Sequence, residues 1–194
     1  MINMKYKIII FCLLITACKN KTSFECMSEK NKNALESIFI NELGENHHSI
    51  YTSIIIKASS NEVWDVMRDF ENMPNWSSTL KKIEGKNLAN KDSVNVTFRM
   101  NGKDQVIPHK FIYSEDEYYG WSDTLLVLPG IVDKHLYRVV KIDSLHTKFV
   151  QSDEFNGQNP NINTLDLARY VLPIYLTFNR ELKQEVEHRF KNID

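Results

Sequence analysis

The chain has 194 residues, of which 42% are hydrophobic and 25% charged, and its formal net charge is −1. This composition is ordinary for a globular protein, and the length suits one domain with a real core. The charge balance gives no basic face, so we do not expect nucleic acid as a partner. The three cysteines, Cys12, Cys18 and Cys26, form neither a disulfide framework nor a metal-binding pair.

The N-terminus has the pattern of a secretory signal. Lys5 and Lys7 form a short basic start, residues 8–17 form an apolar run, and Cys18 follows at once. The run is about half of the roughly 20 residues that cross a bilayer. An uncleaved membrane anchor and a cleaved signal without lipid are the alternatives to a cleaved and lipidated signal.

Residues 14–18, Leu-Ile-Thr-Ala-Cys, resemble a bacterial lipobox. The resemblance implies that residues 1–17 are removed and that Cys18 carries lipid. The domain behind it would be tethered to a membrane of the bacterial cell envelope, since two or three acyl chains give stable anchoring. Loss of Lys5 and Lys7 with the signal lowers the net charge to −3.

A polar tether is expected at residues 18–28 and a helix at residues 29–45. Apolar residues of the second segment recur at helical spacing: Ala34, Leu35, Ile38, Phe39 and Leu43. Gly44 is suited to end this helix.

The remaining chain, residues 46–194, is read as one domain that opens with a strand and a helix. Residues 50–58 are rich in isoleucine and threonine, which favours a strand. Ser59 and Glu62 form a capping box for the helix that follows. Pro74 favours a turn or a new helical start.

Five further segments alternate as strands do, at residues 93–100, 106–114, 117–124, 133–142 and 147–155. Asn101-Gly102 is a hairpin turn signal between the first two. From about Asn163 the pattern is helical, and Pro173 is expected to kink or split that helix. The order indicates an α+β fold in which a curved antiparallel sheet is covered by a long C-terminal helix, with a cavity between them.

Four segments in this order resemble the SRPBCC or START-like superfamily, whose helix-grip fold is found in polyketide cyclases and lipid carriers. They are residues 58–64 (Ala-Ser-Ser-Asn-Glu-Val-Trp), residues 69–76 (Asp-Phe-Glu-Asn-Met-Pro-Asn-Trp), Leu-Pro-Gly at 128–130 with His-Leu-Tyr at 135–137, and residues 147–157. The resemblance implies a cavity for a hydrophobic or amphipathic molecule. It does not choose among carriers, cyclases, hydroxylase domains and stress proteins.

Alternation predicts which side chains face that cavity. The candidate ligand-binding residues are His109, Phe111, Tyr113, Trp121, His135, Tyr137, Gln151, Asp153 and Phe178. Apolar walls with a few polar groups are the usual composition of a ligand site. The alternative is that the polar members only satisfy one another, or lie at sheet ends in solvent.

No cofactor or metal is expected. The adjacent His47 and His48 point in different directions, no histidine, cysteine or acid spacing matches a metal motif, and neither a G-x-S-x-G sequence nor a phosphate-binding glycine loop occurs. The lipobox and the helix-grip resemblance together give the leading hypothesis, a membrane-tethered protein that binds a lipid, isoprenoid or polyaromatic molecule. The second is a cyclase or dehydratase whose acid–base residues are His109, His135 and Asp153. The third is an envelope domain that docks another protein.

Overall fold

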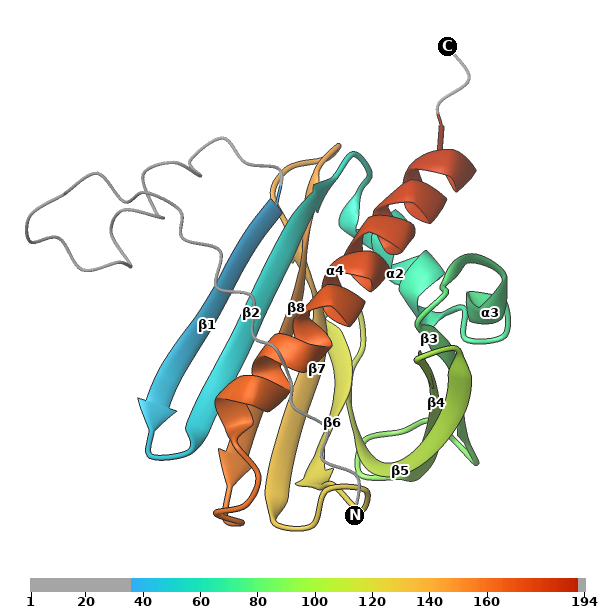
Figure 1. Cartoon of the computed structure of the whole chain (residues 1–194). Helices are drawn as coiled ribbons and strands as arrows, with labels where there is room; N and C mark the ends of the chain where they lie inside the picture. The colour runs from blue at the N-terminus through green and yellow to red at the C-terminus, as the bar shows by residue number, and fades with distance from the viewer. Residues whose placement is uncertain (1–35, 192–194) are drawn as a thin grey trace, which may run out of the picture. The chain divides into compact units, whose positions relative to one another are not determined.

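The computed structural model describes residues 36–191, which form an eight-stranded antiparallel sheet with a long helix packed across its concave face (Figure 1). The strands lie in the order β1-β2-β8-β7-β6-β5-β4-β3. This arrangement confirms the predicted α+β class with a curved sheet around a C-terminal helix. The predicted signal, Cys18 and the tether lie outside the described residues.

The strands are β1 (Glu36–Gly44), β2 (His47–Ile56), β3 (Leu80–Gly85), β4 (Ser93–Met100), β5 (Lys103–Ser114), β6 (Tyr118–Thr124), β7 (Ile131–Lys141) and β8 (Thr147–Gly157). The helices are α2 (Ser60–Arg68), α3 (Met73–Trp76) and α4 (Thr164–Arg189). Within residues 36–191, none of the helices has the length and apolar character that crossing a membrane requires.

The helix predicted at residues 29–45 is wrong from residue 36 onward, because Glu36–Gly44 is strand β1. It pairs antiparallel with β2, with Ile38 opposite Thr52 and Ile40 opposite Ile50. The run Ile-Phe-Ile at its centre favours a strand once a neighbouring edge is present to accept its hydrogen bonds. The spacing that suggested a helix ends on Leu43, which is 51% exposed. The part before residue 36 lies outside the described residues.

The other predicted elements are present, and their capping explains where they begin. Ser59 and Glu62 form the expected capping box at the start of α2, and the Asn163 side chain accepts hydrogen bonds from the first turn of α4. Asn101 and Gly102 both have positive φ, as the β4–β5 hairpin turn requires. Strand β3 was not predicted, because three charged residues among its six hide the alternation.

Helix α4 continues through Pro173 and is not split there. Pro173 lies on the exposed side of the helix, where water can serve the carbonyl that loses its N–H partner. The Thr177 hydroxyl donates to the Pro173 carbonyl at 2.9 Å. The helix therefore presents one continuous face to the sheet, with Val171, Tyr175 and Phe178 buried along it.

Asn46 connects the β1–β2 turn to the start of α4. It has φ +48°, and its side-chain amide donates to the carbonyls of Gly157 and Ile162 at 3.3 and 2.9 Å. Its Oδ1 accepts from the Thr164 N–H at 2.9 Å. One side chain thus fixes where the helix begins relative to the central strands β2 and β8, which pair along their whole length.

Two apolar clusters fill the space between the sheet and the helices. The larger joins α2 and the second half of α4 to the concave face and includes Trp64, Tyr119 and Leu182. The smaller lies under the first half of α4 and includes Phe155 and Val171. Both clusters lie within one compact unit of the described residues 36–191, so residues 28–194 are expected to fold without the preceding segment.

Gly120 marks a close approach between two central strands. It lies opposite Leu136 of β7, and a Cβ added to it would lie 1.9 Å from the carbonyl oxygen of His135. We expect Gly120→Ala to lower the free energy of unfolding by about 3 kcal/mol or more, because a backbone atom of a paired strand cannot move aside. Urea denaturation of residues 28–194 measures this.

Gly44→Ala is the matched control. Its added Cβ would meet nothing closer than the His47 Cβ at 3.9 Å, so the loss should stay below about 1 kcal/mol. Equal losses in the two variants would contradict the role of the close approach.

Candidate functional site

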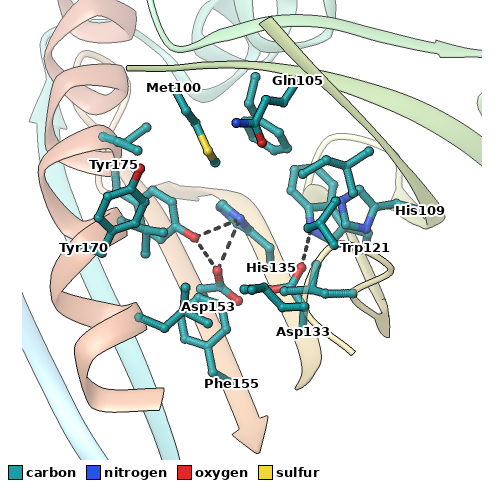
Figure 2. A pocket seen from close by; sticks show the side chains of 18 residues that line it. Met100, Gln105, His109, Trp121, Asp133, His135, Asp153, Phe155, Tyr170 and Tyr175 are labelled. Carbon is teal, nitrogen blue, oxygen red and sulfur yellow. Dashed lines mark hydrogen bonds and ion pairs between the residues drawn. The ribbon is translucent and has the colours of Figure 1, made fainter. Parts of the chain in front are cut away.

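A cavity of about 290 Å³ lies between the first half of α4 and the concave face of β4–β8 (Figure 2). Its apolar wall consists of Phe98, Met100, Ile107, Leu125, Val127, Leu128, Phe155, Leu167, Val171 and Ile174. Its other lining residues are Gln105, His109, Trp121, Asp133, His135, Asp153, Tyr170 and Tyr175. The size is near the lower end of the roughly 300–1,000 Å³ that small-molecule sites occupy.

Strand pairing places the polar side chains in one row at the base of the cavity. Trp121 of β6 lies opposite His135 of β7, and His135 lies opposite Asp153 of β8. Side chains at opposed positions share a face of the sheet. Asp133, two residues before His135, therefore faces the cavity as well, diagonal to Asp153.

His135 is held on both ring nitrogens. Its Nε2 accepts from the Gln151 amide at 2.9 Å, so the proton is on Nδ1. Nδ1 lies 3.3 Å from the Tyr175 hydroxyl and 3.5 Å from Asp153 Oδ2. Burial lowers the pKa of His135 well below its usual value, with repulsion from His109 as a smaller cause. His135 is thus a neutral, fixed imidazole at neutral pH.

Asp133 and Asp153 form a buried carboxyl pair. They lie diagonal to each other across the β7–β8 pair, and both are almost fully buried. Burial raises the pKa of both, and repulsion from Asp153 adds to the rise for Asp133; the pKa of Asp153 is raised to about 6. Asp133 also accepts from Trp121 Nε1 at 2.7 Å, and Asp153 accepts from the Tyr175 hydroxyl.

A second histidine lies on the β5 side of the cavity, paired with a carboxylate. His109 Nδ1 donates to Asp123 Oδ1 at 2.9 Å, and its ring stacks on Trp121 with centroids 4.8 Å apart. Asp123 also accepts from the Lys110 N–H. Among the described residues Nε2 of His109 has no hydrogen-bond partner. A carboxylate that orients one nitrogen and leaves the other available is the arrangement of a general base.

The candidate residues divide into two groups. His109, Trp121, His135 and Asp153 line the cavity. The others do not: Phe111, Tyr137 and Phe178 lie in the larger core cluster, Tyr113 packs against it, and Gln151 lies behind His135. Alternation alone could not separate the two groups of residues. The inner face of each strand lines the cavity at one end of the strand and packs into the core at the other end.

Three residues important to the site were not predicted. Asp133 shares the parity of His135 and Tyr137 on its strand, so alternation could have found it. Tyr175 lies three residues before Phe178, on the same helix face. Asp123 of β6 is identified only by its hydrogen bond to His109 of β5, which sequence alternation does not predict. Among the described residues no group of three metal-binding side chains comes together.

The cavity opens where its lining residues are exposed. Val127 and Tyr170 are 52% and 50% exposed, and the neighbouring Leu126 is 69% exposed. The Asn101 amide donates to the Tyr170 hydroxyl at 3.0 Å, which joins the β4–β5 turn to α4 beside the opening. The mouth is therefore rimmed by these apolar side chains together with the exposed polar side chain of Gln105.

Residues 47–187 match the sequence profile of the family described as "Polyketide cyclase / dehydrase and lipid transport". The chain belongs to this family. The match covers most of the chain and confirms the START-like resemblance. A search among curated proteins finds no match.

Solved structures share the fold at low sequence identity. The Zhui aromatase/cyclase from Streptomyces sp. R1128 is 13% identical, with a TM-score of 0.61 over 74% of this chain and 95% of that one. A START superfamily protein from Mycobacterium smegmatis is 14% identical, with a TM-score of 0.58 over 73% and 98%. Norcoclaurine synthase from Thalictrum flavum is 16% identical, with a TM-score of 0.55 over 79% and 98%. Family membership and the apolar cavity together support a domain that binds a hydrophobic ligand.

The carboxyl pair makes folding stability depend on pH. The pKa of Asp153 is about 6 in the folded protein, above the usual 3.8. Between these two pH values the carboxyl is therefore protonated more fully in the folded state than in the unfolded state. The stability that this carboxyl contributes is therefore complete below about pH 4 and is lost as the pH rises through about 6. We expect the difference in unfolding free energy between wild type and Asp153→Asn to fall by on the order of 2 kcal/mol from about pH 4.5 to about pH 7.

Urea denaturation across this pH range measures the trend. Glu154→Gln is the control, since it removes a neighbouring carboxylate that pairs with His47 and does not line the cavity. A wild-type advantage over Asp153→Asn that stays constant or grows with pH would contradict the raised pKa.

Proposed function

We propose that this protein binds an apolar or amphipathic small molecule, such as a lipid, isoprenoid or polyaromatic compound, while tethered to a bacterial membrane by lipid on Cys18. The observation that carries the binding function is the cavity itself, which has an apolar wall and polar groups gathered at its base. An apolar molecule gains roughly 25 cal/mol for each Å² of surface that such a wall removes from water.

Exposed apolar side chains at the mouth support delivery of the ligand from a membrane. Leu126, Val127 and Tyr170 expose large apolar side chains at the opening, and grouped exposure of this kind marks interaction sites. A water-insoluble ligand partitions into the bilayer, so tethering through Cys18 keeps the mouth near its source. The lipobox-like residues 14–18 are the sequence support for this tether.

Filling the cavity should abolish binding. Ile174 lines the cavity and is half-buried, so Ile174→Trp is expected to weaken binding of the neutral fluorophore N-phenyl-1-naphthylamine to residues 28–194 at least tenfold, because the indole occupies the space of the probe. Arg169→Trp is the control, since Arg169 is exposed on the same helix and does not line the cavity. Failure of the wild type to bind the probe, together with a native mass spectrum that shows no apolar adduct after detergent-free purification, would overturn the binding function.

Replacement of the proposed lipid site should release the protein from membranes. In bacteria that express the full chain and are fed an alkyne fatty acid, we expect the wild type to incorporate label and to sediment with membranes. Cys18→Ser should lose both, because acyl chains supply the anchor. Cys26→Ser controls for unspecific thiol labelling. Label and membrane association that persist in Cys18→Ser would exclude the lipid anchor.

Acid–base catalysis is a second candidate, and the specific observation that favours it is the His109–Asp123 pair on the cavity wall. Nε2 of His109 has no hydrogen-bond partner among residues 36–191, so it can accept a proton from a bound molecule or donate one to it.

Comparison of the molecules bound to two proteins tests this candidate. If the protein is an enzyme, wild type and His109→Asn purified from the same host should carry molecules of different mass in native mass spectra, such as a loss of water for a dehydratase, because the variant retains substrate. Tyr113→Phe, remote from the cavity wall, should match the wild type. The same bound molecule in wild type and His109→Asn favours the carrier.

A further inference from the structure

The base of the cavity is acidic and contains no fixed cation. Asp133 and Asp153 are 3% and 2% exposed and both line the cavity. No lysine or arginine is among its lining residues. Buried charges in proteins are normally paired with an opposite charge or a metal. The acid pair lacks such a partner within residues 36–191.

One oxygen of the pair is free to accept. Asp153 Oδ2 accepts from the Tyr175 hydroxyl, whereas Oδ1 is buried and no N–H or hydroxyl of the described residues donates to it. Asp133 belongs to the same buried pair, and repulsion from Asp153 adds to the rise of its pKa. A ligand that brings its own proton donor can bond to the free oxygen of Asp153.

The groups around the pair do not neutralise it. From β7, His135 is kept neutral by burial, which lowers its pKa. From β5, His109 attracts the ionised form of Asp133 and lowers its pKa, but by less than burial and Asp153 raise it, and His109 is already paired with Asp123 of β6. From α4, Tyr175 contributes a neutral hydroxyl, since burial raises its pKa. The base of the cavity therefore carries net negative charge once Asp153 is ionised.

Aromatic side chains line the cavity around Asp133 and Asp153. Trp121, Phe155 and Tyr175 line the cavity near the pair, and Figure 2 shows Asp153 between Tyr175 and Asp133, with Phe155 below it. Ring faces attract cations, and desolvation strengthens the attraction to about 2 kcal/mol per contact. A metal ion is a poor fit, since no set of three ligand side chains occurs in the described part of the chain.

We propose that the ligand of this cavity is an amphipathic amine, whose cationic head lies between Asp133 and Asp153 and whose apolar part lies along Ile107, Val171 and Ile174. This inference rests on the proposed binding function and names its ligand class. An anionic head such as a carboxylate is excluded by the same charge, because it would face the ionised pair without a counter-ion. A neutral alcohol would fit the space but leave the negative charge unpaired.

Three ligands with one tail and different heads test the proposal. Decylamine, decanol and decanoate compete with N-phenyl-1-naphthylamine for residues 28–194 at about pH 7. We expect decylamine to bind at least tenfold more tightly than decanol, and decanoate to bind most weakly. In Asp153→Asn and Asp133→Asn the affinities for decylamine and decanol should differ by no more than about threefold. The affinity for decanol should be the same as in the wild type. Glu154→Gln removes the same charge outside the cavity and should keep the preference.

A pH series on the wild type covers the case in which the variants do not fold. Decylamine is about as basic as a lysine side chain and stays protonated from about pH 5 to about pH 7, so only protein groups change their charge. The affinity for decylamine should rise about tenfold over this range as Asp153 loses its proton, whereas the affinity for decanol stays level. Equal affinity for amine and alcohol, or an affinity for decylamine that does not rise with pH, overturns the amine proposal and leaves the binding function intact. Binding of none of the ligands, nor of the probe, overturns both.

Discussion

The site depends on the burial of two carboxyl groups under an apolar helix. Asp133 and Asp153 lie on central strands and are almost fully buried, so they depend on hydrogen-bond donors from their neighbours. The Trp121 indole donates to Asp133, and the Tyr175 hydroxyl donates to Asp153. These donors come from β6 and α4, so the curvature of the sheet and the position of α4 are both needed to assemble the base of the cavity. The apolar residues above it then define a space that suits a molecule with one polar end.

The fold could be predicted largely because periodicity survives in most segments. Strands β4, β5, β7 and β8 alternate, and Ser59 and Asn163 cap the helices where expected. Strand β1 could not be assigned, since its apolar spacing fits a helix as well and only the edge of β2 decides between them. Strand β3 is short and charged, and tertiary pairing with β4 holds it. Pro173 was overestimated as a breaker, because its exposed position lets water compensate the lost hydrogen bond.

The site was harder to predict than the fold. Alternation correctly placed His109, His135 and Asp153 on the inner face of the sheet. It does not show whether a residue lies at the cavity end or at the core end of its strand. Tyr137 and Phe111 share that face and lie in the core, since α2 and the second half of α4 cover that end of the sheet. The pairing of Asp133 with Asp153 and of His109 with Asp123 depends on strand register, which a single sequence does not determine.

The pairing of β2 with β8 has a consequence for the order of events in the cell. Opposed residues in this central pair, such as Ile50 and Asp153, are far apart in the chain, and the Asn46 contacts that fix the start of α4 span a similar separation. Closing such long loops is slow, because entropy is lost before any contact forms. A nascent chain therefore cannot complete the centre of its sheet until β8 has been synthesised. Folding this late leaves the chain unfolded for longer during synthesis, and an unfolded chain suits the export to the envelope that is proposed for it.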